Sequence, residues 1–395
     1  MLVLPSLADP AALRDWHGTF RAFREHDRVH WDEGAGTWLV THYHDVVAAL
    51  HNDLLDSCGP TSFMGLFPPA EQEEFRDLQA FYESWMVFSG PPYHQRVRSA
   101  VQGVLTPRAV ARRRAEVRAT ARAQLDLARD GVVDFFADFA RPLAISVISE
   151  VLGIPSDEWD VFSRWSHDLI AFIGAPRPEV EKARIARRAY AEMREYVLDF
   201  TAALRRAGRT DNPLLAVEPI GEHAVVGTFA QFLTGGCDPI SSGIANTVVT
   251  MLRHPDQTAR LRADRSLLPT AVEEFLRYEA PFTLAPRVAR EPVTVADREL
   301  PAGSRVMLMF TAANRDPAVF RDPDRVDVGR SPNPHLAFGK GNHYCIGAGL
   351  ARLEMAETID TLLTEAPDLA LAGDVEWTAS LGLRSVAKLP VTVGR

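Results

Sequence analysis

The sequence predicts a mainly α-helical fold with a minor β-rich part, and three patterns support this prediction. Helical periodicity extends from Val117 to about Arg206, interrupted at Gly153-Ile154-Pro155 and again after Gly174. Residues 222–253 form a long apolar stretch that predicts one further helix. Strand-like patterns are short and few, at Thr37–Val40, Val293–Val295 and Arg305–Met309.

The bulk composition is that of an ordinary globular chain, and it argues against several classes of protein. The 395 residues, of which 46% are hydrophobic, can bury a large core, and we expect a single domain over residues 1–395. The formal net charge of −9 argues against a nucleic-acid-binding protein. No stretch of about twenty apolar residues predicts a membrane span. The three cysteines lie too far apart to suggest disulfides, so we expect a cytoplasmic protein.

Shorter elements follow from breakers and helix-start signals along the chain. One helix is expected at Pro10–Glu25 and another at Tyr43–His51. A further helix is expected from Tyr93, directly after a double proline, because proline is favoured where helices begin. The turn Pro301-Ala302-Gly303 predicts that the two strands on either side of it pair in a small sheet.

The predicted helix at residues 222–253 contains a weak point, Thr234-Gly235-Gly236-Cys237-Asp238-Pro239. Within a helix, glycine costs about 1 kcal/mol and proline about 3 kcal/mol relative to alanine. Proline also lacks the N–H that would bond the carbonyl four residues earlier, here that of Gly235. We therefore expect a kink at this point and a functional reason for it.

A stretch near the carboxyl end, FGKGNHYCIG from Phe338 to Gly347, combines a cysteine with closely spaced glycines. An apolar, helix-forming run follows Cys345, so a helix N-terminus would lie beside the sulfur and favour negative charge on it. These features suit a thiolate ligand to a metal, with Phe338 screening the sulfur from solvent. The glycines that let the backbone fold tightly around the sulfur are Gly339, Gly341 and Gly347.

Two simpler interpretations of Cys345 remain open from the residues alone. A lone cysteine is usually a small buried hydrophobic residue. His343 and Cys345 could also be half of a zinc site, but zinc needs about four ligands, commonly in two spaced pairs. The other cysteines, Cys58 and Cys237, have no cysteine or histidine close to them in the sequence, which weakens the zinc alternative.

The cysteine loop resembles that of the cytochrome P450 family of haem-thiolate monooxygenases. The family pattern of Phe, Gly, His and Cys falls without a gap on Phe338, Gly341, His343 and Cys345. The resemblance extends over about residues 10–393 and implies a triangular, mainly helical fold with a long central helix over the haem. It also implies a small β-rich lobe, to which about residues 1–57 and 281–310 would contribute.

The resemblance implies a haem b cofactor, iron protoporphyrin IX, whose iron has Cys345 as its axial ligand. His94 and Arg98 are four residues apart, so they share a helix face and can bind one anion together, although alone they would be interpreted as a solvated surface. The family places residues at these positions on the haem propionates. The implied cofactor-binding residues are His94, Arg98, Arg287 and His343 at the propionates, with Phe338, Gly339 and Cys345 at the iron.

In the family, the central helix crosses the haem, and small residues open a groove for dioxygen. Gly235 and Gly236 match that groove, and Asp238 matches the acidic residue that relays protons. The family usually has threonine at the next position, where this chain has Pro239, so the alcohol of the acid–alcohol pair is missing. Because cleavage of the O–O bond consumes protons, we expect them to come by ordered water from Asp238 or from a hydroxyl or carboxyl group of the substrate.

Two further groups of residues have roles that the family implies. Glu274 and Arg277 are three residues apart on a helix and would form, with Arg330, a lock that is structural rather than catalytic. A surface pair of this kind would contribute little by itself. The substrate pocket would be lined by large side chains, each of which could equally be ordinary core: Trp85, Met86, Phe88, Phe172, Phe232, Phe282, Leu284 and Leu381.

The implied reaction is the oxidation of a bound organic molecule by activated dioxygen, with electrons from a ferredoxin and its reductase. Aromatic loop residues and the missing threonine suggest hydroxylation of a bulky, oxygenated secondary metabolite, such as an aromatic polyketide, either free or tethered to a carrier protein. Phenolic or other oxidative coupling and peroxide-driven oxidation are alternatives. A haem-thiolate binding or sensing protein without turnover is a further alternative, for which Pro239 is the argument.

Overall fold

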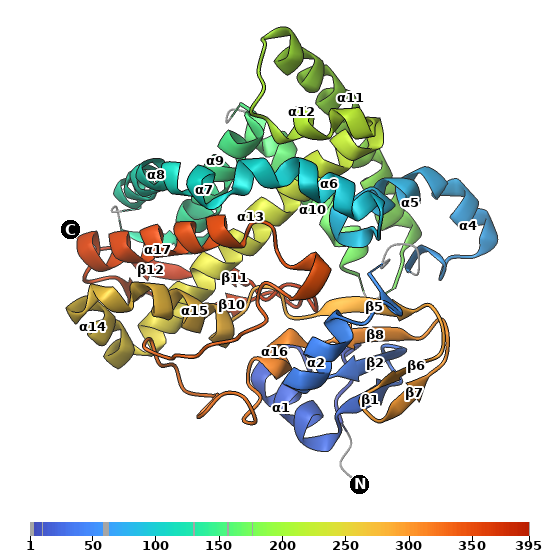
Figure 1. Ribbon diagram of the computed structural model, residues 1–395. Helices are drawn as coiled ribbons and strands as arrows, with labels where there is room; N and C mark the ends of the chain where they lie inside the picture. The colour runs from blue at the N-terminus through green and yellow to red at the C-terminus, as the bar shows by residue number, and fades with distance from the viewer. Residues whose placement is uncertain are drawn as a thin grey trace. The chain divides into compact units, whose positions relative to one another are not determined.

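The computed structural model describes residues 4–9, 11–57, 63–128, 131–155, 158–175 and 177–394, so Cys58 lies outside the described residues. The chain divides into two compact units. Unit 1 comprises residues 1–55, 111–144 and 238–395, and unit 2 comprises residues 56–110 and 145–237. The architecture is mainly helical with small sheets, as the sequence predicted (Figure 1). The expectation of a single domain remains a prediction.

A five-stranded sheet with the strand order β1-β2-β8-β5-β3 forms one part of unit 1. β2 and β8 pair in parallel, whereas β1 with β2 and β5 with β8 are antiparallel. Three helices lie beside this sheet in Figure 1: α1 (Trp16–His26), α2 (Tyr43–Leu50) and α16 (Phe310–Ala313). The strands are β1 (Val29–Asp32), β2 (Thr37–Val40), β3 (Leu55–Asp56), β5 (Ala285–Ala289) and β8 (Arg305–Leu308).

The predicted pairing of the strands around Pro301–Gly303 is wrong. β6 (Val293–Val295) pairs instead with β7 (Arg298–Leu300) through a tight turn in which Ala296 has φ of 55°. β8 fills the gap between β2 and β5, because this position buries both Val306 and Leu308. The remaining strands are β4 (Val132–Asp134) with β12 (Pro390–Thr392) and β9 (Ala370–Leu371), and β10 (Glu376–Trp377) with β11 (Val386–Lys388). β4 also interrupts the run that was predicted to be helical throughout.

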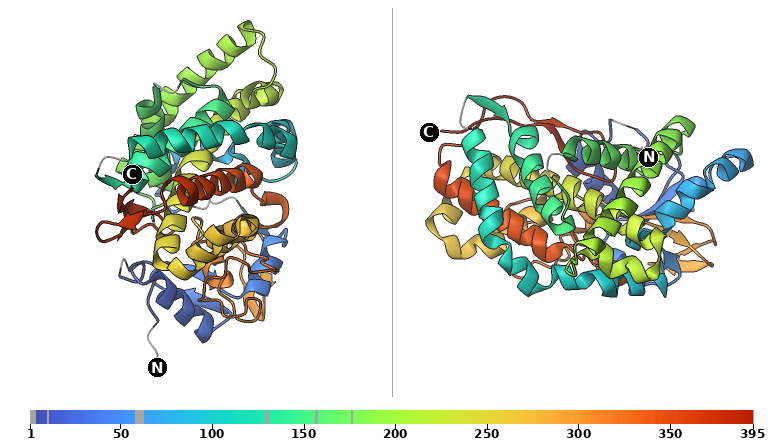
Figure 2. Two further views of the ribbon diagram at one scale, coloured as in Figure 1. Left: turned by 90° about the vertical axis from the view of Figure 1, so that its left-hand side faces the viewer. Right: turned by 90° about the horizontal axis from the view of Figure 1, so that it is seen from above.

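Ion pairs hold two helices of unit 1 side by side, α8 (Arg114–Leu127) and α17 (Ala348–Glu365) (Figures 1 and 2). Arg118 Nε lies 2.6 Å from Glu357 Oε2, and Arg122 Nε lies 2.6 Å from Glu365 Oε1. Arg114 also pairs with Glu357. α17 begins just after Cys345, and these ion pairs fix it to α8 along its length. The other helices of unit 1 are α14 (Pro255–Ala263) and α15 (Leu268–Tyr278).

Unit 2 consists of helices around a core rich in aromatic rings. Its helices are α4 (Pro69–Glu74), α5 (Arg76–Glu83), α6 (Tyr93–Val101), α10 (Trp159–Ile173), α11 (Val180–Arg206) and α12 (Pro213–Val217). Three helices continue across a unit boundary: α7 (Pro107–Arg112), α9 (Arg141–Leu152) and α13 (Glu222–Arg253). The last confirms the predicted long helix at residues 222–253. Within the described ranges, no helix is long and apolar enough to cross a membrane.

The two adjacent glycines of α13 have different surroundings. A Cβ atom added at Gly236 would overlap the side chain of Ile148 on α9, so this glycine permits close packing of two helices. A Cβ atom added at Gly235 would meet no atom of the described residues within 4 Å. Gly235 is also exposed, although Leu233 and Thr234 just before it are buried. The helix therefore presents an open face at Gly235.

A buried ion pair fixes the long segment that leads toward Cys345. Arg277 of α15 is 1% exposed and makes two bonds to Glu274, of 2.8 and 2.9 Å. Its remaining hydrogens bond carbonyl oxygens of the following segment, those of Asn314, Pro323 and Arg325. Arg330 Nε completes the arrangement, 3.0 Å from Glu274 Oε2. The structure thus brings together the three residues for which a structural role was predicted.

Arg277→Gln is expected to lower the free energy of unfolding by about 3–5 kcal/mol, because it leaves the Glu274 carboxylate buried without its main partner. The matched control is Arg260→Gln, which removes an ion pair to Asp327 of 2.8 Å between half-exposed side chains. That change should cost less than about 1 kcal/mol. Urea unfolding followed by circular dichroism measures both, and equal losses would show that the buried pair has no special role.

Gly236→Ala is expected to lower the free energy of unfolding of the ligand-free protein by about 1–3 kcal/mol, because the new methyl group overlaps Ile148. Gly235→Ala is the control, and it should leave that free energy unchanged or raise it by up to about 1 kcal/mol, since alanine is the better helix former. The same urea titration compares the two variants. A loss at Gly235 as large as that at Gly236 would contradict the open face described above.

Candidate functional site

The loop before α17 holds Cys345 at the surface in a constrained backbone. Cys345 N donates a hydrogen bond of 2.9 Å to Phe338 O, which closes the loop at its base. Gly339 and Gly341 have φ of 66° and 70°, a region that side chains other than glycine rarely adopt. Cys345 is exposed and Phe338 is half-buried. Cys345 therefore lies at the surface on a loop of defined shape.

The loop packs against the end of α2 in unit 1. A Cβ atom at Gly341 would lie 3.0 Å from Leu50 O, so this glycine is required by close approach as well as by its φ angle. Lys340 Nζ donates to Tyr43 OH at 3.1 Å, and Tyr43 OH donates to Pro334 O at 2.7 Å. These contacts fix the loop from the side of α2.

Gly347 has a different role from the other two glycines. Its φ of −84° is ordinary, but a Cβ atom added there would lie 3.9 Å from Cys345 Sγ. Gly347 is the N-cap residue of α17, so the N-terminus of this helix lies beside the sulfur, as predicted. The positive end of the helix dipole and the amide N–H groups favour a thiolate at this position.

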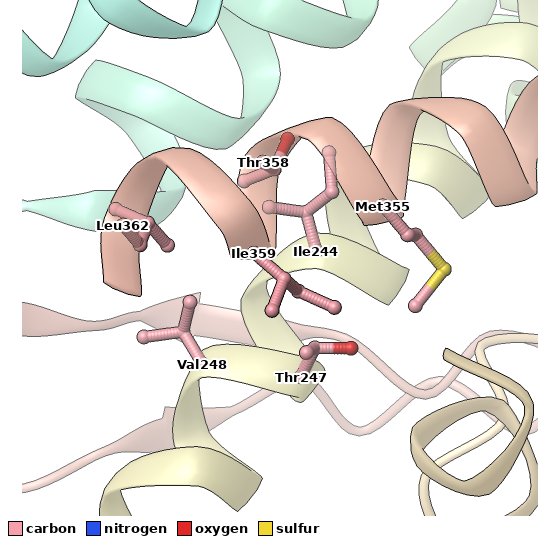
Figure 3. Close-up of a pocket in the computed structure, with 7 residues that line it drawn as sticks. All are labelled: Ile244, Thr247, Val248, Met355, Thr358, Ile359 and Leu362. Atoms are coloured by element: carbon pink, nitrogen blue, oxygen red, sulfur yellow. The ribbon is translucent and has the colours of Figure 1, made fainter. Parts of the chain in front are cut away.

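The packing of α17 on α13 is tight and leaves no ligand pocket between them. Figure 3 shows side chains of both helices at this contact, and the space between them holds no room for a water molecule. The residues drawn are Ile244, Thr247 and Val248 from α13 and Met355, Thr358, Ile359 and Leu362 from α17. α13 is therefore a rigid support for the helix that follows Cys345.

The cationic residues predicted for the propionates lie on regular elements. In unit 2, His94 is buried and Arg98 is half-buried on the same helix, α6. Burial, and then the positive charge of Arg98, lower the pKa of His94. In unit 1, Arg287 is buried on β5 and donates to Pro286 O at 2.7 Å, whereas His343 is half-buried in the 3-10 turn Gly341–His343.

Three hydroxyl groups of α13 close to Pro239 bond the backbone of the helix itself. Ser241 and Ser242 are fully buried and both donate to Asp238 O, at 3.2 and 2.6 Å. Thr234 donates to Ala230 O at 2.8 Å. Pro239 lies inside the helix and is buried. Thus none of these three hydroxyls donates toward a ligand, and Asp238, which is half-buried, is the acidic residue of this segment.

In unit 1, the structure brings together two predicted pocket segments that are far apart in the sequence. Phe282 pairs with Leu383 in an isolated bridge, and Thr283 Oγ1 donates to Leu381 O at 2.5 Å. Phe282 is 45% exposed, which is unusual for a ring of this size, and Leu284 and Leu381 are half-buried. These three apolar side chains are accessible to a ligand.

In unit 2, most of the predicted pocket residues belong to the aromatic core. Phe172 has an exposed fraction of 0% and packs against Phe63 and Tyr82, with ring centroids 5.3 and 6.0 Å away. This placement favours the alternative that Phe172 is ordinary core. The other members are buried, with the exception of half-buried Phe88: Trp85, Met86 and Phe232.

A group of side chains next to the cysteine loop was not predicted from the sequence. Arg352 of α17 pairs with Glu273 of α15 and lies over the ring of Phe338. The predicted structural residue is Glu274, whereas Glu273 beside it was not predicted to have a role. The available signal was an arginine on the helix that follows Cys345, but its partners come from distant parts of the sequence and could not be identified before folding.

The side chains present fit a haem better than a zinc ion. Within the described ranges, no group of three or more histidine, cysteine or acidic residues could hold a metal ion. A haem needs one accessible thiolate, cations for its propionates and space for a flat ring. In unit 1, the exposed Cys345 before α17 and the buried Arg287 of β5 meet the first two of these needs. Unit 2, taken by itself, offers Arg98 on α6 and the open face of α13 at Gly235.

Comparison with known proteins identifies the family. Residues 180–365 match the family described as "Cytochrome P450". The chain is 34% identical over 411 residues to 6-deoxyerythronolide B hydroxylase of Saccharopolyspora erythraea, with 99% of each chain covered. It is 33% identical over 369 residues to the biotin biosynthesis cytochrome P450 of Bacillus subtilis, with 90% of each covered.

Solved structures agree with this relationship. P450BioI, in complex with an acyl carrier protein ligated to hexadec-9Z-enoic acid, has a TM-score of 0.90 at 29% identity, covering 97% of this chain and 100% of that one. CalO2 has a TM-score of 0.90 at 28% identity, with 99% of each chain covered. Membership of this family implies a haem–thiolate centre. The chain belongs to the cytochrome P450 family and is a cytochrome P450 monooxygenase.

Proposed function

We propose that the chain binds haem b through Cys345 and oxidises a bulky, oxygenated secondary metabolite that supplies a proton itself. Arg287 and His343 of unit 1, and His94 and Arg98 of unit 2, would bind the propionates. A bound haem supplies reductive activation of dioxygen, with electrons from a ferredoxin and its reductase. The side chains of the protein hold the haem, orient the substrate and manage protons.

The backbone bonding of the hydroxyl groups around Pro239 is the observation that carries this proposal. Asp238, acting through ordered water, is the proton donor that this part of the helix offers, because Pro239 has no hydroxyl and Ser241 and Ser242 donate to the carbonyl of Asp238. A hydroxyl or carboxyl group on the substrate would take the place of the missing alcohol. The exposed Phe282 suits a substrate with a large apolar body.

The relatives support the class of substrate. One relative is named as the hydroxylase of 6-deoxyerythronolide B and another as mycinamicin IV hydroxylase/epoxidase. P450BioI has been solved with an acyl chain on a carrier protein. We propose a polyketide-like acid or alcohol as the substrate, presented free or on a carrier protein, with hydroxylation as the reaction and oxidative coupling as the alternative outcome.

The purified protein is expected to contain haem whose reduced carbon monoxide complex shows the band typical of thiolate ligation. The ferric form is titrated with free and carrier-tethered polyketide acids. One class of these compounds should shift the Soret band from its low-spin to its high-spin position, because that ligand displaces water from the iron. Cys345→Ala should abolish the thiolate band, while Cys237→Ala should retain it. A thiolate band in the Cys345→Ala variant would refute the assigned ligand.

Pro239→Thr is expected to raise the fraction of electrons that end in product when the substrate is a surrogate lacking the hydroxyl or carboxyl group. With the natural type of substrate the gain should be small, because the substrate already supplies the proton. Product formed per NADH consumed measures this, with ferredoxin and its reductase present. Ser242→Ala is the matched control and should leave the product formed per NADH consumed unchanged for both substrates. If Pro239→Thr and the parent protein are equally uncoupled with the surrogate, substrate assistance is contradicted.

A further inference from the structure

Arg352 contacts both sides of the cysteine loop from the helix that follows it. Its Cζ lies 4.5 Å from the centre of the Phe338 ring, a distance typical of a cation–π contact. Its Nη1 donates to Tyr344 OH at 3.1 Å. Phe338 accepts the backbone hydrogen bond of Cys345, and Tyr344 is the residue before Cys345. One guanidinium thus contacts the side chains of Phe338 and Tyr344, the residues that adjoin Cys345 through this hydrogen bond and through the chain.

Glu273 balances the charge of this guanidinium. Arg352 Nε and Nη2 bond the two carboxylate oxygens of Glu273 at 2.6 and 2.8 Å, a bidentate geometry that fixes the plane of the guanidinium. Burial alone would raise the pKa of Glu273, but hydrogen bonds from Arg352 and His335 lower it to about 2, so the carboxylate is ionised at neutral pH. The hydrogen bond to Glu273 likewise raises the pKa of Arg352.

His335 completes the group. Its Nδ1 accepts a hydrogen bond of 3.2 Å from Ala337 N, and its Nε2 lies 2.9 Å from Glu273 Oε2. Arg352, Glu273 and His335 are named the Arg352 clamp below, and the ion pair of Arg352 with Glu273 places one positive and one negative charge beside the cysteine loop.

We propose that the Arg352 clamp positions Phe338 and Tyr344 around Cys345 and, through its balanced charges, sets the reduction potential of the haem bound there. Arg352 is a positioning residue, since it contacts Phe338 and Tyr344 of the loop, and Glu273 positions Arg352 in turn. The charges of both residues act on the haem through space. This inference rests on the proposed function, because it takes Cys345 as the thiolate ligand.

The sign of each charge makes the proposal specific. Reduction adds one electron, so a nearby cation stabilises the reduced form and a nearby anion destabilises it. Glu273→Gln removes the negative charge, leaves Arg352 unbalanced and should shift the potential to more positive values. Arg352→Gln leaves the Glu273 carboxylate unbalanced and should shift the potential to more negative values. The double variant should lie close to the parent protein.

Spectroelectrochemical titration of the haem-loaded protein measures the potential, and the carbon monoxide band measures thiolate retention. Arg352→Lys keeps the charge but loses the planar fork, so it should keep the potential and increase the fraction of protein that loses the thiolate band. Arg122→Gln is the matched control, because it removes the ion pair of 2.6 Å between Arg122 of α8 and Glu365 at the far end of α17. This variant should change neither the reduction potential nor the carbon monoxide band.

Opposite shifts of the reduction potential in the two single variants would support the charge balance, because a purely structural clamp would not produce shifts of opposite sign. Shifts of the same sign, or an unchanged potential in both, would overturn the proposal. If Arg352→Gln does not fold, the reduction potentials of Glu273→Gln and Arg122→Gln still test the proposal. The positive shift is expected for Glu273→Gln and not for Arg122→Gln. A parent protein without haem or thiolate band would instead refute the proposed function.

Discussion

The burial of Arg277 is the constraint on which the cysteine loop depends. A guanidinium removed from water is tolerated only if each of its hydrogens finds an acceptor. Two of its bonds go to Glu274 on its own helix, and the others reach carbonyl oxygens of the segment at residues 314–325. That segment has no regular secondary structure after α16, so the arginine supplies the order that backbone hydrogen bonds supply elsewhere. The loop with Cys345 begins at Phe338, farther along the chain from this ordered segment.

Electrostatics near Cys345 come from side chains that the neighbouring helices hold in place. α17 brings its own N-terminus to the sulfur and Arg352 to the face of Phe338. α15 contributes Glu273 beside the buried Glu274, so adjacent carboxylates of one helix serve two functions. One fixes the segment before the loop and the other neutralises the cation beside it. The packing of α17 against α8 and α13 makes these positions rigid enough to control a local potential.

The central helix, α13, combines an open face at Gly235 with serine hydroxyls that bond its own backbone. Gly236 brings α9 close, while Gly235 leaves a face open. The bonds of Ser241 and Ser242 to the carbonyl of Asp238 lie just after Pro239, the residue that removes the backbone donor from the carbonyl of Gly235. The same bonds keep these two hydroxyls away from proton transfer, which supports the proposed dependence on the substrate.

Local pattern in the sequence was sufficient to predict the features that are confined to short stretches of the chain. The long helix at residues 222–253, the strand Thr37–Val40, the helix after Cys345 and the cysteine loop follow from periodicity, glycine spacing and a motif contained in ten residues. Local pattern also identified the family, because the motif residues are adjacent in the chain. What depends on distant partners could not be determined in this way.

Contacts between distant segments account for the rest. β8 joins β2 and β5 and pairs with neither β6 nor its sequence neighbour β7, because its place in the sheet buries Val306 and Leu308. Phe172 is core because three aromatic rings, those of Phe63, Phe67 and Tyr82, surround it. The Arg352 clamp joins α15, α17 and the loop, and its charge balance exists only where the fold brings residues 273, 335 and 352 together. Contacts between residues so far apart in the sequence leave no periodic signal, so only the folded chain reveals them.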